Sequence, residues 1–234
     1  MWYDMWYWFL LIPLLLFSLF TQFRVKSTFK KYNQIATKNG LTGAQAASMI
    51  LNMHNLVNVR IEGVSGELTD HYDPRSNVLR LSDSTRDVNS IAAIGVAAHE
   101  AGHAIQDGVN YVPNKIRASL VPAARIGSSS GPYLAIIGVG ISYSIEFGMT
   151  LAYIGLALYV FAFLFYLVTL PVEFNASSRA IKILNTSGIL TSDELKGAKK
   201  VLNAAAMTYV ASTVSALFSL LRIALIVLGG RRRD

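Results

Sequence analysis

Four long apolar runs interrupt the polar parts of the chain. They cover residues 5–23, 128–145, 147–170 and 207–230. A transmembrane helix needs about 20 predominantly apolar residues, so the first three runs predict spanning helices. Arg222 interrupts the last run, which predicts either a fourth spanning helix or one that lies partly in the membrane interface. The pattern predicts a mainly α-helical membrane protein with about four apolar transmembrane helices.

The first apolar run has the features of an uncleaved membrane anchor. Three Trp and two Tyr lie within residues 2–8, at its leading end and just before it, and such amphipathic rings favour the membrane interface. Positive charge follows the run, at Arg24, Lys26, Lys30 and Lys31, and no small-residue cleavage site comes after it. A secretory signal peptide has its charge before the run. We therefore expect an N-terminus that lies outside the cytoplasm.

Residues 24–125 form the predicted soluble portion, in which helical and strand patterns are both present. Residues 42–52 have apolar side chains at helical spacing, with Thr42 as the cap. Residues 57–66 and 77–82 alternate apolar and polar side chains as short strands do, and turn residues lie between them. We expect a small sheet, with 77–82 as an edge strand on which an extended peptide can pair.

Residues 90–107 predict a buried helix. Asn89 and Ser90 are good N-cap residues, and Gly108 is typical of the position after a helix. Apart from one polar motif, the residues are almost all Ile, Ala, Val and Gly, so most sides of the helix suit a core. Polar groups on such a helix are costly to bury without partners. A metal ion with a water molecule would supply these partners.

The polar motif is His99-Glu100-Ala101-Gly102-His103, an H-E-x-x-H sequence. The i, i+4 spacing places both imidazoles on one face of the helix, where they can share Zn²⁺. Glu100 then lies beside the metal, where it can take a proton from water and pass it to a leaving amine. The motif predicts a zinc peptidase.

The runs 128–145 and 147–170 predict a tight helical hairpin that returns the chain to the side it left. Its tip carries Glu146 and no Lys or Arg, whereas basic residues flank the spans on the other side. Basic residues favour the cytoplasmic side, so we expect a multi-pass protein of the cell membrane with a cytoplasmic catalytic portion. Four complete spans would place Arg231–Arg233 outside, against this rule.

Residues 171–206 predict two more helices on the same side as the motif. One begins near Pro171 and is closed by Gly188, and the next is capped by Thr191 or Ser192. No internal repeat or low-complexity linker separates the parts of the chain. We therefore expect a single integrated domain over all 234 residues.

Composition narrows the class of protein. Hydrophobic residues make up 53% of the chain and charged residues 15%, and the mean hydropathy is +0.41, which excludes an ordinary soluble domain. The chain has no Cys, so zinc ligands must be His, Asp or Glu. The net charge is +7, and the Lys and Arg residues cluster beside the apolar spans. Membrane lipid headgroups are therefore the expected partner, and nucleic acid is not.

A catalytic zinc ion usually has three protein ligands, and the third lies outside the motif. The metzincin continuation fails, because Gln106 and Val109 stand where Gly and a third His belong. Glu146 is expected on the wrong side of the membrane, and Glu194 in a solvated capping segment. Glu173, which follows the third apolar run in PVEFNAS, is therefore the predicted ligand.

Three other polar residues have open roles near such a site. Asp107 lies one turn beyond His103, where it can support a ligand from behind or simply be solvated. His71 can reach the site from a loop as a substrate or oxyanion contact, or form local hydrogen bonds in its turn. Tyr209 can stabilise a tetrahedral intermediate or pack at the membrane interface.

Several long segments of the chain resemble the YugP-like neutral zinc metallopeptidases of bacterial membranes. They include VSGELTDHYDP, SIAAIGVAAHEAGHAIQD, PVEFNASSRA and KKVLNAAAMTYVAS, and together they extend over nearly the whole chain. The resemblance implies a membrane-bound zinc endopeptidase of the gluzincin type with a zincin-like α+β portion. It also implies that His99 and His103 bind zinc and that Glu100 is the catalytic acid and base.

The segment EFNAS is similar, more distantly, to the E-[FY]-x-A-D segment of heat-shock membrane proteases and prenyl-protein proteases. The Glu of that segment is their third zinc ligand, which implies the same role for Glu173. Ser177 stands where that wider group has Asp. The group that orients the ligand histidines here is therefore open between Ser177, Asp107 and a backbone carbonyl.

Together these features predict a zinc endopeptidase that cuts membrane-associated or misfolded polypeptides near the cytoplasmic surface. The alternative is a catalytically inactive zinc-binding membrane scaffold, but a structural site has no use for Glu100 beside an open coordination position. An ion-handling protein is disfavoured because the spans are few and the hairpin lacks ionisable residues. No oligomeric state is predicted.

Overall fold

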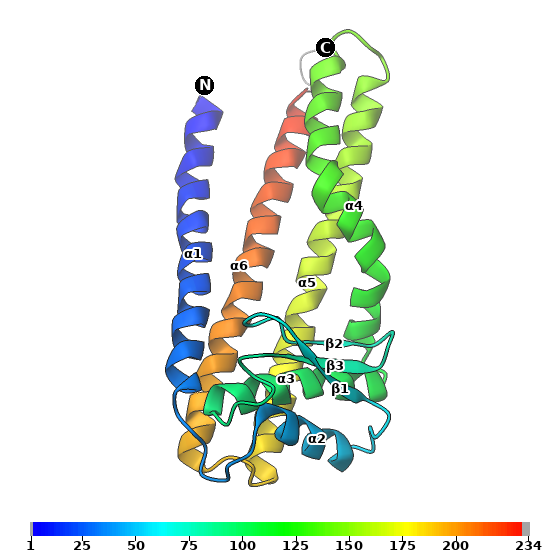
Figure 1. Ribbon diagram of the computed structural model, residues 1–234. Helices are drawn as coiled ribbons and strands as arrows, with labels where there is room; N and C mark the ends of the chain where they lie inside the picture. The colour runs from blue at the N-terminus through cyan, green and yellow to red at the C-terminus, as the bar shows by residue number, and fades with distance from the viewer. Residues whose placement is uncertain (1, 231–234) are drawn as a thin grey trace. The chain divides into compact units, whose positions relative to one another are not determined.

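The computed structural model describes the backbone of residues 2–230 and the side chains of residues 8, 9 and 11–229. The structure does not describe the side chains of the aromatic residues before Trp8, which we expect at the membrane interface. It also does not describe those of Arg231–Arg233. In chain order the elements (Figure 1) are α1 (Trp2–Asn33), α2 (Gly43–Met53), β1 (Arg60–Val64), β2 (His71–Asp73), β3 (Val78–Ser82), α3 (Ile91–Gly108), α4 (Val112–Ile141), α5 (Gly148–Thr186) and α6 (Ser192–Gly230).

The described chain divides into two compact units, and each has its own core. Unit 1 consists of the described parts of Met1–Leu15, Val112–Pro171 and Tyr209–Asp234. Unit 2 consists of Leu16–Tyr111 and Val172–Thr208. The expectation of a single integrated domain stays a prediction.

In unit 1, α4 and the first part of α5 form an antiparallel hairpin (Figure 1). Small residues let the two backbones approach closely, as in many membrane helix pairs. A Cβ atom added to Gly131 would lie 2.9 Å from the carbonyl oxygen of Gly155. Buried residues of α4, α5 and α6 form the core of this unit.

Two helices of the described residues, α5 and α6, are long and apolar enough to cross a membrane. Only 17% and 28% of their most apolar segments are buried, so this apolar surface faces outward, as a bilayer requires. The expectation of about four spans is therefore wrong for the described residues. α4 begins at Val112, inside the predicted soluble portion, and its polar Arg125 and Ser128–Ser130 make it less apolar. The predicted span at 5–23 begins among side chains that are not described.

In unit 2, α3 lies in the middle of the core. Its Ala and Ile side chains are almost fully buried and pack against α2, β3, α5 and α6. As predicted, the hydroxyl of Ser90 caps this helix by accepting a hydrogen bond from the N–H of Ala93. Thr42 and Gln45 form a capping box at the start of α2. Local side-chain chemistry thus fixes where both helices begin.

The sheet of unit 2 has the strand order β1-β3-β2. β3 pairs in parallel with β1 and antiparallel with β2, so the prediction that residues 77–82 form an edge strand is wrong. The reason is that His71–Asp73, in the predicted turn region, pairs as a further strand. Beyond β2, the carboxylate of Asp70 accepts a hydrogen bond of 2.8 Å from the N–H of Ser82 and covers the rest of that edge of β3.

The expectation of a helix that starts near Pro171 is also wrong, because α5 continues through this residue. Long apolar helices tolerate an internal proline when surrounding groups satisfy the freed backbone carbonyl. The end of the helix is as predicted: α5 ends at Thr186, and Gly188 adopts a left-handed φ of +68° that glycine accommodates without strain.

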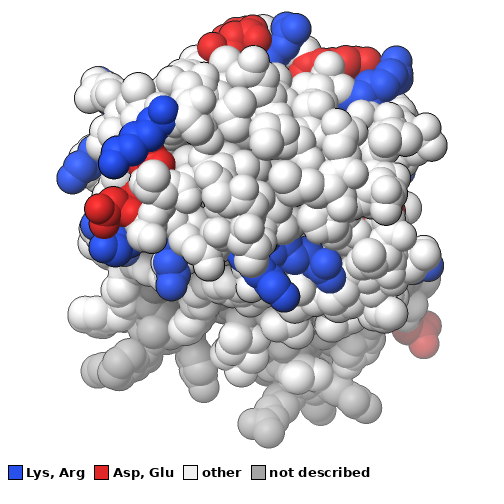
Figure 2. All heavy atoms as spheres, turned by 90° about the horizontal axis from the view of Figure 1, so that it is seen from below, with Lys and Arg blue, Asp and Glu red and all other residues white. Residues whose placement is uncertain are grey.

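One face of unit 2 carries charges of both signs. Figure 2 views the molecule from the end where α2 lies, and shows Lys and Arg around the margin of this face with Asp and Glu beside several of them. Positive side chains here are mixed with negative ones, whereas a nucleic-acid interface needs a continuous basic patch. The expectation that nucleic acid is not a partner stays a prediction.

α3 and α5 touch backbone to backbone at Gly102. A Cβ atom added to Gly102 would lie 2.8 Å from the carbonyl oxygen of Ala176, which is itself fully buried. The glycine inside the H-E-x-x-H motif therefore sets how closely α5 approaches α3. This approach brings residues 173–177 alongside the two motif histidines.

We expect Gly102→Ala to destabilise unit 2, because the new methyl group must displace the α5 backbone. Overpacking of this kind costs about 1–3 kcal/mol, whereas replacing a helical Gly by Ala otherwise gains up to about 1 kcal/mol. Gly140→Ala in α4 is the matched control, since nothing lies within 4 Å of a Cβ atom there. Denaturant unfolding in detergent should show a lower midpoint for Gly102→Ala alone. Equal midpoints for the two variants would contradict the close contact.

Candidate metal centre

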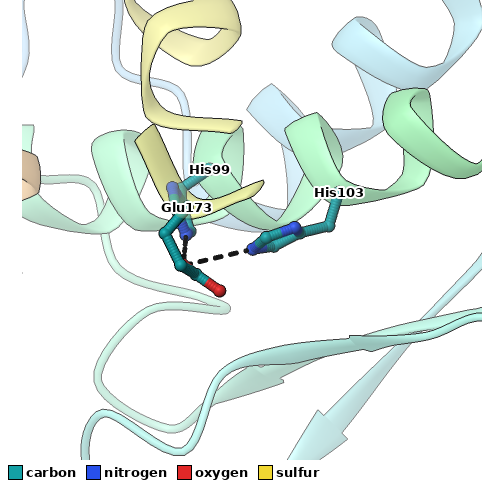
Figure 3. A group of neighbouring side chains, drawn as sticks. All are labelled: His99, His103 and Glu173. Carbon is teal, nitrogen blue, oxygen red and sulfur yellow. Dashed lines mark hydrogen bonds and ion pairs between the residues drawn. The ribbon is translucent and has the colours of Figure 1, made fainter. Parts of the chain in front are cut away.

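His99 and His103 project from one face of α3, as Figure 3 shows. Their ring centroids lie 4.7 Å apart and their ring planes meet at 84°. Glu173 reaches the same point from α5, with its Oε2 atom 3.2 Å from Nε2 of His99 and 3.6 Å from Nε2 of His103. The structure thus brings the three predicted zinc ligands together.

The carboxylate of Glu173 is held in a largely dry environment. Glu173 is only 4% exposed, and His103 only 9%. Burial raises the pKa of Glu173, but hydrogen bonds from His103 and His99 outweigh this effect and hold the pKa well below its usual range. Glu173 is therefore ionised at neutral pH, which is the form that binds a metal.

The positions of these side chains fit one zinc ion. Their ligand atoms all lie within 4.8 Å of one another. With bonds to zinc of about 2.0–2.2 Å, the edge of a coordination tetrahedron is about 3.3–3.6 Å. The distances of 3.2 and 3.6 Å from the carboxylate oxygen to the two imidazoles are close to these values. Two imidazoles and one carboxylate also form a donor set of catalytic zinc sites, which leave a fourth position for water.

The second nitrogen of each imidazole has a partner of its own. The hydroxyl oxygen of Ser177 lies 3.1 Å from Nδ1 of His99, and Nδ1 of His103 donates to Oε1 of Gln106 at 3.0 Å. Both contacts turn the Nε2 atoms towards Glu173. Of the groups considered for orienting the histidines, the structure places Ser177 beside one of them.

Gln106 is a contact that the sequence analysis missed. Its position counted there only as a mismatch to the metzincin pattern. Gln106 is nevertheless fully buried, three residues after His103 on the same side of α3. A long amide side chain on an otherwise apolar helix needs hydrogen-bond partners when it is buried. A glutamine on an otherwise apolar helix, three residues after a predicted ligand, is therefore the sequence signal that could have indicated the role of Gln106.

Glu100 is buried next to these ligands, with 8% of its surface exposed. Burial raises the pKa of its carboxyl group to about 7. The charge of His99 opposes this shift, while the negative charges of Glu173 and Asp70 add to it. A carboxyl group whose pKa lies near neutrality can both accept a proton and return it. Glu100 therefore has the electrostatic setting of a general acid and base.

Two candidates from the sequence lie beside the cluster rather than in it. His71 is exposed on β2, with Nδ1 2.9 Å from the carbonyl oxygen of Thr69. Its charge still lowers the pKa of Glu100, so the two side chains are electrostatic neighbours. Asp107 accepts a hydrogen bond of 3.2 Å from the hydroxyl of Tyr72 and is not among the clustered ligand atoms.

The remaining candidates have other surroundings. Thr191–Asp193 are exposed, as expected of a solvated capping segment, but Glu194 itself is only 7% exposed. Its carboxylate accepts hydrogen bonds of 2.7 Å from the N–H groups of Lys38 and Thr191, which makes it a capping group. Tyr209 and the exposed Glu146 belong to unit 1, and the role of Tyr209 stays a prediction.

Comparison with known proteins gives the family of the chain. Residues 7–228 match a family described as "Putative neutral zinc metallopeptidase". A relative from Bacillus subtilis (strain 168), "Putative membrane protease YugP", is 43% identical over 223 residues, which cover 95% of this chain and 97% of the relative. No solved structure matches the chain. Since the match includes all three clustered ligands and nearly every other residue, this chain belongs to the neutral zinc metallopeptidase family.

Proposed function

We propose that the chain is a membrane-bound zinc endopeptidase, in which His99, His103 and Glu173 hold the metal and Glu100 is the general acid and base. The strongest support is the meeting of three ligand atoms from two helices, with separations of 3.2 and 3.6 Å from the shared carboxylate oxygen. The family description and the printed name of the Bacillus relative support hydrolysis of peptide bonds as the reaction.

The residues of the site have separate roles in hydrolysis. When bound, zinc supplies a Lewis acid that polarises a peptide carbonyl and makes water a better nucleophile. Glu100 takes the proton from the attacking water and then gives it to the nitrogen of the leaving amine. Glu173 is ionised, and the ring nitrogens of His99 and His103 that face it would be occupied by the metal, so Glu100 would be the group that moves protons.

The substrates that we propose are membrane-associated or misfolded polypeptides. Two helices of the described residues suit a bilayer. In the sequence, Glu173 follows the apolar run 147–170 by less than one helical turn of α5. The third ligand is thus tied to the end of a predicted span, which favours peptide bonds held at the membrane surface. The basic residues beside the spans favour the cytoplasmic surface.

β2 offers a place for an extended substrate. It is an edge strand of the sheet and contacts α3, which carries the motif. A peptide that adds to β2 as a further strand would pair its backbone groups with those of β2. His71, exposed on β2 and an electrostatic neighbour of Glu100, would then lie beside the substrate.

We expect the purified protein to bind about one zinc ion per chain, and His99→Ala and His103→Ala to lose it, since each removes one of three ligands. Elemental analysis after dialysis measures the metal. His54→Ala is the matched control, because His54 is exposed at the end of α2 and its Nδ1 is bonded to the carbonyl oxygen of Ile50. Stoichiometric zinc in both ligand variants would place the metal elsewhere.

Substitutions of Glu100 and Glu173 should have different effects on zinc binding and on hydrolysis. Glu100→Gln should keep zinc and the fold but lose about 10²–10⁴-fold in peptide hydrolysis, because an amide cannot accept the proton. Glu173→Gln should weaken zinc affinity by about tenfold or more, because it removes a charged ligand. A competing chelator and a peptide-cleavage assay in detergent measure both effects. Zinc binding without cleavage by the parent protein would favour the scaffold instead, and full affinity in Glu173→Gln would refute its role as a ligand.

The absence of cysteine allows a clean test of topology. We expect Ser144→Cys, in the exposed turn of the hairpin, to react with a membrane-impermeant maleimide in intact cells. Ser65→Cys, exposed after β1, should react only after the membrane is opened, because basic residues flank the spans on its side. The parent chain is the control without a thiol. Labelling of Ser65→Cys in intact cells would overturn the cytoplasmic placement.

A further inference from the structure

Gln106 is a polar side chain whose three hydrogen bonds tie the metal centre to α5. Its Nε2 donates to the carbonyl oxygen of Val172 at 2.8 Å and to Oδ1 of Asn175 at 3.0 Å. Its Oε1 accepts from Nδ1 of His103 at 3.0 Å. Gln106 is fully buried, so water cannot replace any of these bonds.

The side-chain amide of Gln106 has only one orientation that satisfies its hydrogen bonds. An amide has two N–H donors on nitrogen and an acceptor oxygen. The two groups on the α5 side, the oxygens of Val172 and Asn175, are acceptors and use both donors. A flipped amide would set its own oxygen against these two oxygens. The oxygen of Gln106 must therefore face His103.

This fixed amide determines the form of His103. Because the oxygen of Gln106 only accepts, Nδ1 of His103 must carry the hydrogen, and Nε2 then keeps its lone pair for a metal. We propose that Gln106 is a positioning residue that sets this tautomer, and that Asn175 in turn positions Gln106. The inference rests on the proposed function in one respect, namely that His103 is a zinc ligand.

Asn175 is held from its other side as well. Nε of Arg179 donates to the same Oδ1 atom at 2.7 Å, and the guanidinium group of Arg179 lies 6.0 Å from the ring centre of Tyr111. Asn175 and Arg179 are one helical turn apart on α5. Their contact keeps the amide oxygen of Asn175 directed at Gln106. The hydrogen bonds thus form a continuous chain from Arg179 to the metal-facing imidazole.

His99 lacks such a constraint. Its partner at Nδ1 is the hydroxyl of Ser177, which can donate or accept. That hydroxyl therefore does not impose a tautomer on His99. The two ligand histidines should respond differently when their partners are removed, and this difference separates a positioning role from mere packing.

The test is a pair of substitutions at Asn175. Asn175→Asp keeps an oxygen that accepts from both Gln106 and Arg179, whereas Asn175→Leu has a similar volume and no acceptor. We expect Asn175→Leu to weaken zinc affinity about tenfold, as substitutions of residues that support a metal ligand by hydrogen bonds commonly do. The zinc affinity of Asn175→Asp should stay close to that of the parent. Gln106→Leu should lose about 10–100-fold. Chelator competition measures the affinities.

The second readout uses the zinc-free protein and does not depend on activity. Nitrogen chemical shifts of the imidazoles report the tautomer of each ring. In the parent and in Asn175→Asp, Nδ1 of His103 should always carry a hydrogen, whereas Gln106→Leu should also populate a form in which Nδ1 carries none. Ser177→Ala is the comparison at His99 and should leave His103 unchanged.

The outcomes separate this inference from the proposed function. Equal zinc affinities in Asn175→Asp and Asn175→Leu would show that the acceptor oxygen at this position does not matter, and would overturn the inference. An unchanged tautomer of His103 in Gln106→Leu would do the same. If Gln106→Leu does not fold, the Asn175 pair still decides. If the proposed function is wrong, His103→Ala should retain zinc. Gln106→Leu, which keeps His103, should still change the tautomer of that imidazole.

Discussion

The backbone contact between α3 and α5 at Gly102 is the constraint on which the candidate metal centre depends. α3 offers His99 and His103 one turn apart, and Gly102 lies between them in the sequence. Because a methyl group there would meet the carbonyl oxygen of Ala176, the helices can approach this closely only at a glycine. The approach lets Glu173 reach both imidazoles at once. A residue without any polar side chain thus sets the geometry of the ligands.

The parts of the fold that depend on neighbouring residues were predictable from the sequence. Ser90 was expected to cap the motif helix, which was predicted over 90–107 and is observed over Ile91–Gly108. The cap at Thr42 and the end of α5 near Gly188 also follow from local chemistry. Glu173 was predicted as a ligand by a different route, from the elimination of the other carboxylates and from a resemblance, and the structure places it beside the two histidines.

The features that the sequence did not predict depend on contacts between distant segments. β2 has only three residues, too few for an alternating pattern, and it becomes a strand because β3 offers a partner. Pro171 normally marks the start of a helix, yet here α5 continues through it. The role of Gln106 likewise becomes visible only when α5 supplies acceptors for its amide.

Charge balance gives a reason for the neutral partners of the ligand histidines. In the proposed site, Glu173 and the ionised form of Glu100 would carry two negative charges, which one Zn²⁺ ion would cancel. Buried charge that is compensated in this way avoids most of the cost of desolvation. A carboxylate in place of Ser177, as in the wider group of membrane proteases, would add a negative charge beside His99. Ser177 and Gln106 instead orient the imidazoles by hydrogen bonds alone.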